Sequence, residues 1–250
     1  MSVNKNLIKD LLIFVFSFVL YYIFGTGLIY LILKAIYNAN NSLFPSYIND
    51  EIFRERGLSN IAQLISSIII LVLIAIIYFK DLKGHFNFFK SYKLVFKTLG
   101  YALFVYFVTI CYNLFLPLAG GTGEDGSNFA LIKSSMKNQF FIMLGLVVII
   151  GPIIEELLFR FIPFKALKNK IPGWSLILIT TVLFTIPHML SLFKSNDLRG
   201  DILALPKYLI IGCMIGSYYY KNNEIGRSIL IHMVYNIISF VLMSISLSLI

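Results

Sequence analysis

The chain has 250 residues; 58% of them are hydrophobic, 13% are charged, and the formal net charge is +9 at pH 7. Several apolar runs approach the length of about twenty residues at which a helix crosses roughly 30 Å of hydrocarbon. This composition excludes a soluble globular domain and predicts an all-α, polytopic integral membrane bundle formed by one domain, residues 1–250.

Seven membrane spans are predicted along the chain. The first is longer than the apolar core of a signal peptide and lacks a small-residue cleavage motif, so we interpret it as a retained helix. The predicted spans cover residues 11–36, 58–79, 94–116, 139–163, 174–193, 204–220 and 227–249.

The connections between these spans carry an uneven share of basic residues. Twelve Lys and Arg residues, Arg227 among them, fall on the side of the N-terminus, and eight fall on the other side. The positive-inside rule therefore predicts a multi-pass cell-membrane protein with a cytoplasmic N-terminus and an external C-terminus. These basic residues would face anionic lipid, so membrane lipid is an expected partner and nucleic acid is not.

Two connections and two cysteines need a separate interpretation. Residues 82–97 mix Phe and Tyr with Lys, which predicts an interfacial segment in which His85 is a solvated group outside any site. Residues 117–138 contain the run GGTGEDGS, which predicts a mobile external loop of unassigned function. Cys111 and Cys213 fall in predicted spans without CxxC spacing, so neither a disulfide nor a thiolate metal site is expected.

Polar residues interrupt the last apolar spans at a repeated spacing. A charged side chain at the centre of a spanning helix costs about 2.5–3.5 kcal/mol, so a chain that keeps such groups is expected to use them. Residues four apart share one face of a helix. Three such pairs occur: Glu156 with Arg160, Phe184 with His188, and His232 with Asn236.

Glu155 is expected to play a different part from its neighbour. It lies about 100° around the helix from Glu156. Glu156 can therefore form an internal ion pair with Arg160 while Glu155 points elsewhere. The turn signal centred on Ile171 puts Glu155 and His188 at the same height of a helical hairpin.

Three prolines fall beside these residues. Pro152, Pro163 and Pro187 each remove a helical donor and disturb the carbonyl four residues earlier. In a membrane, such carbonyls need neighbouring protein or a water-filled cavity. We therefore expect water near Glu155. Because the turn at Ile171 and the start of the last span, which carries His232, both lie on the predicted cytoplasmic side, we expect a cavity that opens to the cytoplasm.

The residue types suit the activation of water. A carboxylate in a low-dielectric cavity holds a proton more readily than one in water, as a base acting near neutral pH requires. Glu155 with His188 is the expected base unit. His232 and Asn236 can donate hydrogen bonds to the oxyanion formed when an amide carbonyl is attacked.

These motifs resemble those of the CPBP family, the membrane CAAX proteases and bacteriocin-processing enzymes also called the Abi family. The family motifs EExxxR, FxxxH and HxxxN correspond to EELLFR, FTIPH and HMVYN, in family order, over about residues 139–240. The resemblance implies an intramembrane glutamate-type endopeptidase without cofactor. In it the first Glu and the FxxxH His activate water, the HxxxN pair serves the oxyanion, and Glu156, Arg160 and Phe184 support the site.

The resemblance also bears on organisation and substrate. We expect residues 139–250 to form the catalytic core and residues 1–138 to support it. Eukaryotic members trim prenylated proteins, whereas bacterial ones are linked to peptide maturation, bacteriocin immunity and signalling. The abundance of Ile, Phe, Tyr, Lys and Asn suggests AT-rich coding, as in low-GC Gram-positive bacteria. That origin favours a peptide or membrane-protein substrate.

Other interpretations of the same residues remain open. The acid pair could be a helix-locking ion network, and the histidines could make interhelical hydrogen bonds. The same acids and histidines could bind a metal ion, but the HExxH motif of membrane zinc peptidases is absent. Ser217 lacks the sequence context of an intramembrane serine protease. The chain could also be a proton-coupled transporter, or a non-catalytic immunity or regulatory scaffold that binds a membrane partner.

Overall fold

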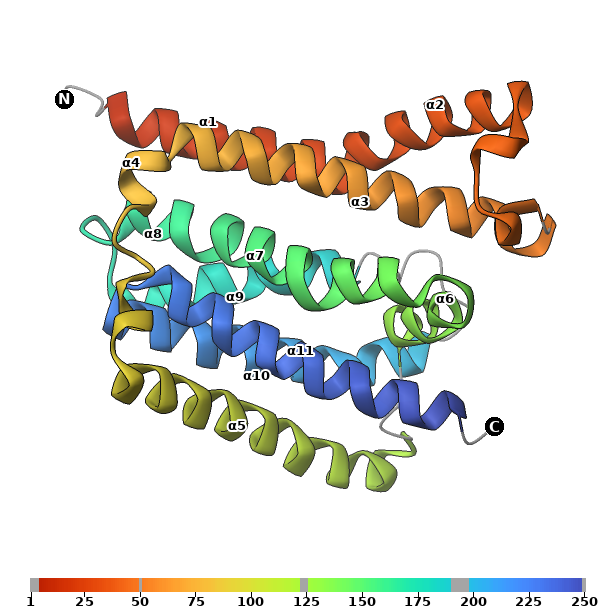
Figure 1. Ribbon diagram of the computed structural model, residues 1–250. Helices are drawn as coiled ribbons and strands as arrows, with labels where there is room; N and C mark the ends of the chain where they lie inside the picture. The colour runs from red at the N-terminus through yellow and green to blue at the C-terminus, as the bar shows by residue number, and fades with distance from the viewer. Residues whose placement is uncertain (1–4, 50, 122–125, 190–197, 249–250) are drawn as a thin grey trace.

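A computed structural model describes residues 5–49, 51–121, 126–189 and 198–248, and these residues confirm an all-α polytopic bundle, with no strand among them (Figure 1). The N-terminal helices are α1 (Lys5–Val19), α2 (Thr26–Ala39), α3 (Glu51–Ile77), α4 (Phe79–Leu82), α5 (Tyr92–Phe115) and α6 (Ser127–Leu144). They are followed by α7 (Gly151–Glu156), α8 (Ile162–Leu167), α9 (Gly173–Met189), α10 (Leu198–Asn222) and α11 (Ile225–Ser248).

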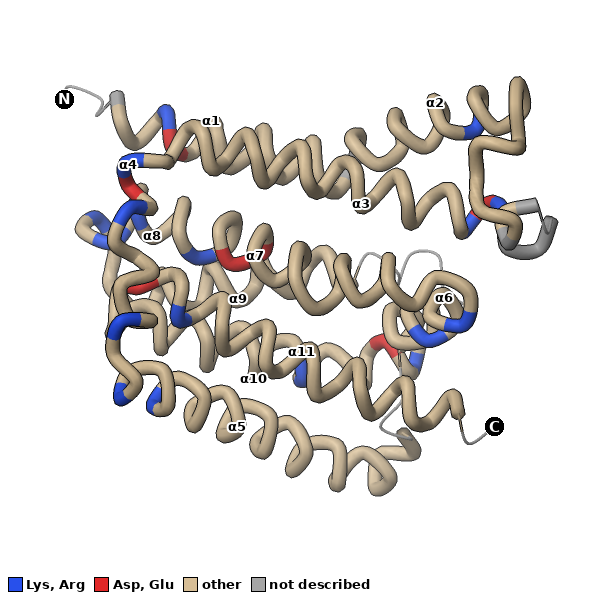
Figure 2. The backbone as a smooth tube through the Cα atoms, viewed as in Figure 1, with Lys and Arg blue, Asp and Glu red and all other residues tan. Residues whose placement is uncertain are grey.

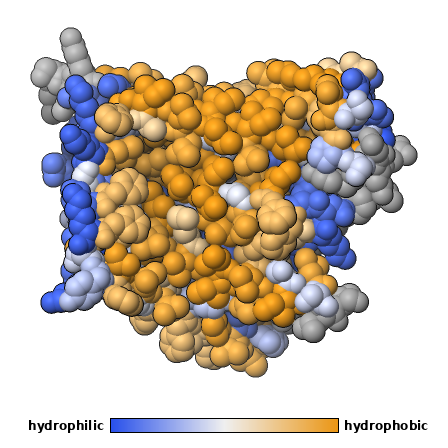
Figure 3. All heavy atoms as spheres, in the orientation of Figure 1, coloured by the Kyte–Doolittle hydropathy of each residue, from blue (hydrophilic) through white to orange (hydrophobic). Residues whose placement is uncertain are grey.

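The helices follow the predicted spans closely. Six helical segments are long and apolar enough to cross a membrane: Asn6–Ala39, Arg54–Ile77, Tyr92–Ala119, Ser127–Leu167, Leu198–Asn222 and Ile225–Ser248. The remaining predicted span corresponds to α9, a shorter apolar helix of 17 residues that packs along α10. The face shown in Figure 3 is a broad apolar belt with hydrophilic side chains at its two ends.

The bundle has two different ends, and the chain termini lie at opposite ones (Figure 1). The lysine-rich end contains α4, the end of α8 and the starts of α5, α9 and α11 (Figure 2). The other end, here called the α6 end, contains α6, the connection between α2 and α3 and the end of α11. The lysine-rich end is defined by Lys80, Lys83, Lys90, Lys165, Lys168, Lys170 and Lys221.

Two turns of π-helix interrupt the span that carries the acid pair. The first covers Gly145–Ile150 and the second covers Leu157–Phe161, and each ends two residues before a proline. A proline removes one backbone donor and its ring crowds the preceding turn, and a wider π turn accommodates both effects. The backbone disturbance expected at Pro152 and Pro163 is therefore present as π-helix.

The expected loop at residues 117–138 is wrong from Ser127 onward, while residues 122–125 of its Gly-rich run lie outside the described residues. Leu116–Ala119 form a short 3₁₀ turn, and α6 begins at Ser127, where Asp201 of α10 accepts hydrogen bonds from the Ser127 N–H and hydroxyl at 2.7 Å each. A carboxylate at a helix start satisfies donors that have no partner within the helix. The sequence pattern missed this helix because its acidic partner lies 74 residues away.

Helix α6 changes direction at Gln139, whose φ of −132° and ψ of 41° are not helical. The preceding turns run across the α6 end, and the following ones enter the span (Figure 1). The Gln139 side chain donates to the Gly57 carbonyl at 3.1 Å and accepts from Asn60 at 2.5 Å. The kink is thus held against α3, and it coincides with the predicted start of the span.

Two basic residues at the lysine-rich end are more buried than expected. Arg227 is 4% exposed, not a surface charge; it donates to Thr98 and Asn222 at 3.0 Å each and to the Tyr218 hydroxyl. His85 is half-buried, and its Nδ1 accepts a hydrogen bond from the Ile225 N–H at 3.3 Å. Burial lowers the pKa of His85, which is therefore only partly solvated, and His85 does not line the main cavity of the bundle.

We predict that Arg227→Ala destabilises the bundle. Hydrogen bonds to a charged group contribute about 1.5–3 kcal/mol, and the substitution leaves buried acceptors on α5 and α10 without their donor. Thermal unfolding in detergent should show a clear loss of stability. The control is Lys221→Ala, an exposed cation of the same end; equal unfolding midpoints for the two variants would contradict the prediction.

Candidate active site

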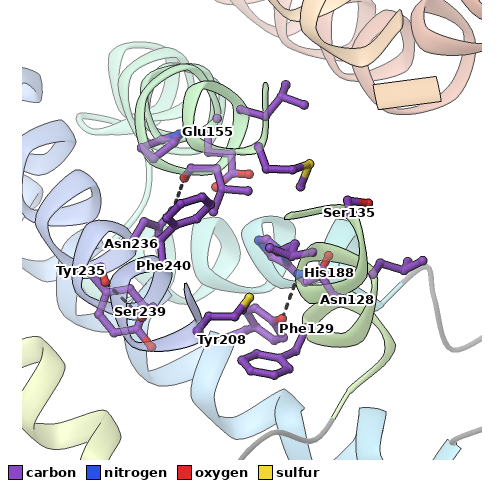
Figure 4. A pocket seen from close by; sticks show the side chains of 18 of the residues that line it. Asn128, Phe129, Ser135, Glu155, His188, Tyr208, Tyr235, Asn236, Ser239 and Phe240 are labelled. Atoms are coloured by element: carbon purple, nitrogen blue, oxygen red, sulfur yellow. Dashed lines mark hydrogen bonds between the residues drawn. The ribbon is translucent and has the colours of Figure 1, made fainter. Parts of the chain in front are cut away.

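A cavity of about 810 Å³ collects the predicted catalytic residues. Glu155 reaches it from α7, His188 from α9 and Asn236 from α11 (Figure 4). His232 of α11 also lines it. Phe184 also lines it, whereas Glu156 and Arg160 lie behind the wall with no exposed side-chain surface. Three helices distant in sequence, α7, α9 and α11, thus bring the predicted groups to one place.

A chain of charged and polar contacts connects both acids to one histidine. Arg160 Nη1 lies 3.1 Å from Glu156 Oε1, an ion pair within one helix turn. The same carboxylate oxygen lies 2.9 Å from His232 Nδ1. His232 Nε2 in turn lies 3.6 Å from Glu155 Oε2.

This chain of contacts fixes the histidine ring. An ionised carboxylate only accepts hydrogen bonds, so the contact with Glu156 assigns the proton to Nδ1 of His232. Nε2 is then directed at Glu155, the acid that lines the cavity. The ion pair of Glu156 and Arg160 agrees with the sequence prediction, but the ring beside Glu155 belongs to His232, which we had assigned to the oxyanion.

Arg160 is held by three kinds of contact. Besides its ion pair, Nη2 donates to the Gly212 carbonyl at 3.3 Å, and the guanidinium lies 4.3 Å from the centre of the Phe184 ring. A Cβ at Gly212 would come within 3.1 Å of Thr181 and 3.2 Å of Phe184. Glycine therefore lets α10 approach α9 closely enough to present this carbonyl.

His188 is positioned by aromatic side chains. Its ring stacks on Tyr208 with the ring centres 4.4 Å apart and an angle of 5° between the planes. The Phe184 ring lies edge-on to it at 5.0 Å. The Tyr208 hydroxyl accepts a hydrogen bond from Asn128 Nδ2 at 3.2 Å (Figure 4).

Asn236 compensates for the backbone donor that is missing at Pro152. The Gly151 N–H bonds to the Leu146 carbonyl, as in a π turn, and proline has no N–H to offer to the next carbonyl, that of Val147. Asn236 Nδ2 instead donates to Val147 O at 2.7 Å. A side-chain amide has two donors, so this bond orients the amide and leaves its second N–H for another acceptor.

The sequence analysis missed several residues around the cavity, including Tyr208. Other polar lining residues come from α3, α5 and α6, all before residue 139. The sequence does contain a pattern on α3, where polar residues recur at helical spacing around the start of a predicted span. These residues are Arg56, Ser59, Asn60 and Gln63.

Within the described ranges, no group of three or more His, Cys, Asp or Glu side chains is placed to hold a metal ion. That the site works without a metal ion remains a prediction from the sequence.

We predict that Glu156→Gln and Arg160→Ala lower stability, because each removes one partner of a fully buried ion pair. Such a loss costs about 3–5 kcal/mol. Glu155→Gln is the matched control: it changes a neighbouring acid that lines the cavity and has no Arg partner among the ion pairs of the described residues. Unfolding of purified protein in detergent measures the effect, and three equal midpoints would contradict this division between the two acids.

Comparisons with known proteins agree with the motifs. Residues 137–238 match a family described as type II CAAX prenyl endopeptidase Rce1-like. The membrane-embedded CAAX protease MroQ of Staphylococcus aureus (strain USA300) is 27% identical over 147 residues, which is 59% of this chain and 57% of that relative. No solved structure gives a significant match. The matched region contains all three motifs, and both comparisons support a protein of the CPBP family.

Proposed function

We propose that the protein is an intramembrane endopeptidase that hydrolyses a peptide bond with water activated by Glu155. The observation that carries this proposal is the convergence of Glu155, His188, His232 and Asn236 on one cavity. Polar groups buried in a membrane are costly, so a protein that keeps them usually needs them for function. These four groups line an open space instead of pairing only among themselves.

The chemistry begins with a water molecule beside Glu155. Its carboxylate takes one proton from the water as the oxygen attacks the carbonyl carbon of the scissile bond. His232 Nε2, 3.6 Å from Glu155, is placed to share that proton. The proton then passes to the leaving nitrogen as the C–N bond breaks, which restores Glu155 for the next cycle.

The tetrahedral intermediate carries a negative oxygen that needs donors. The second N–H of Asn236 and the His188 ring both belong to the cavity wall and are the candidate donors. A single such donor contributes about 2.7–4 kcal/mol in enzymes that stabilise an oxyanion. We thus assign proton transfer to Glu155 with His232, and we assign His188 to the substrate, as a donor to its oxyanion.

The substrate that we propose is a peptide or a membrane protein. Its cleavage would serve peptide maturation, bacteriocin processing or immunity, or quorum-sensing signalling. The relative from Staphylococcus aureus is named a membrane-embedded CAAX protease, which supports proteolysis within a membrane. A non-catalytic scaffold remains the alternative. The two proposals differ in whether the cavity residues are needed.

We predict that Glu155→Gln and His188→Ala abolish cleavage in cells. Loss of a general base such as Glu155 costs about 10²–10⁴-fold in rate, and loss of an oxyanion donor such as His188 costs about 10²–10³-fold, enough to bring product to background. Membrane and secreted peptides from cells lacking the protein are compared by mass spectrometry with those from cells that carry wild type or either variant. Products found only with wild type identify the substrate.

The control for this experiment is Asp81→Asn, an exposed acid at the lysine-rich end that pairs with Lys165 and does not line the cavity. It should yield the wild-type products at equal expression. A phenotype retained by Glu155→Gln and His188→Ala, with an unchanged peptide pool, would favour the scaffold.

We also predict that Tyr208 acts as a positioning residue for His188 through its ring. Tyr208→Phe keeps the stacked ring and should retain most activity, whereas Tyr208→Leu removes an aromatic contact of about 0.5–1.5 kcal/mol and lets the imidazole turn. The expected result is a lower kcat for Tyr208→Leu with little change in KM. Equal loss in both variants would assign the role to the hydroxyl, and no loss in either would remove Tyr208 from the mechanism.

A further inference from the structure

The position of the cavity along the bundle bears on the direction from which substrate reaches it. Its lining residues lie at Tyr21 and within 55–63, 106–113, 128–155, 184–211 and 232–246. None comes from 64–105, 156–183 or 212–231, three fully described stretches that pass through the lysine-rich end. The cavity is therefore confined to the part of the bundle toward the α6 end.

A packed layer closes the cavity toward the lysine-rich end. Residues 157–162 on the π turn and the start of α8 are at most 3% exposed, and the ion pair of Glu156 and Arg160 lies beside them. Further along, Arg227 and its hydrogen bonds to α5 and α10 fill the space between those helices. No cavity-lining residue lies beyond this layer among the described residues.

The opposite end of the cavity reaches the end of the bundle. Along α11 the lining residues run from His232 to Ser246, which at 1.5 Å per residue is about 20 Å. On α3 they include Glu55 and Arg56, close to the start of that helix. The mouth is polar, and its side chains tie neighbouring helices together: Glu55 to Lys34 at 2.8 Å, and Arg56 to Ser134 at 2.7 Å.

The charge distribution assigns the two ends to the two sides of the membrane. In the sequence, twelve Lys and Arg residues fall at the predicted span ends on the side of the lysine-rich end, against eight on the other side. Under the positive-inside rule the lysine-rich end is cytoplasmic. From these observations, and resting on the proposed protease function, we infer that substrate reaches Glu155 from the extracytoplasmic side, as an extended polypeptide segment that enters at the α6 end.

The dimensions of the cavity limit the form of this segment. An extended chain spans about 3.3 Å per residue, so a path of roughly 20 Å holds about six residues. A folded domain cannot enter, whereas a chain terminus or an unfolded loop can. The substrate is thus a peptide already outside the cytoplasm, or the external tail of a membrane protein, and water reaches the site by the same opening. This inference replaces the cytoplasmic opening expected from the sequence.

Cysteine accessibility tests the inference directly. In a cysteine-free background, Cys111→Ala with Cys213→Ala, one cysteine is placed at the mouth as Ser59→Cys and another at the lysine-rich end as Asn169→Cys, an exposed position. Protoplasts are treated with a membrane-impermeant sulfonated maleimide before and after permeabilisation. We expect strong labelling of Ser59→Cys that permeabilisation barely increases, and labelling of Asn169→Cys only after permeabilisation.

The reverse pattern would place the mouth in the cytoplasm and overturn the inference. So would a Ser59→Cys that reacts only after unfolding in detergent, since the mouth would then be closed to water. A second mouth variant, Ser246→Cys, covers the case in which Ser59→Cys does not fold.

The labelling result does not depend on activity, so a failure of the protease proposal is distinguishable from a failure of this one. Where cleavage is detected, external maleimide should reduce product formation by Ser59→Cys and leave the product of Asn169→Cys unchanged. Products collected separately from medium and membranes then distinguish a secreted peptide from the tail of a membrane protein.

Discussion

The ion pair between Glu156 and Arg160 lies at the centre of this molecule with no solvent exposure on either side chain. Separating such charges from water costs several kcal/mol per ion, and the pair is tolerated only because further contacts surround it. Those contacts come from three other helices: His232 on α11, the Gly212 carbonyl on α10 and the Phe184 ring on α9. Helices α9, α10 and α11 are thus assembled around one ion pair.

The prolines link this packing to the cavity, because they leave backbone carbonyls that need a donor from another helix. In a lipid environment a carbonyl without a donor must find a partner within the protein, and Pro152 leaves Val147 in that position. The amide of Asn236 fills the role, which brings α11 against the helix that carries Glu155. The same hydrogen bond satisfies the backbone and orients a side chain of the cavity.

Much of this arrangement follows from short-range patterns in the sequence. The spans are predicted by apolar length, the pairing of Glu156 with Arg160 by helical spacing, and the disturbed backbone by the prolines. The position of His232 between both acids does not follow, because it depends on the relative rotation of two helices 76 residues apart. The same reason explains why Tyr208, whose partners His188 and Asn128 come from other helices, carried no sequence signal.

The asymmetry of the bundle follows from the same physics. Where the ion pair and the residues of the second π turn are packed, the helices leave no space, and the bundle is closed. Toward the α6 end the chain instead places Ser, Asn and Gln on the inward faces of α3 and α6, and short polar side chains beside an opening can be hydrated. The acid next to the closed layer, Glu155, is the deepest carboxylate that water can reach through this opening. One spanning helix thereby gives two adjacent glutamates opposite environments: Glu156 is held in a buried ion pair, whereas Glu155 lines the cavity. This difference supports the proposal that the first glutamate fixes the structure and the second activates water.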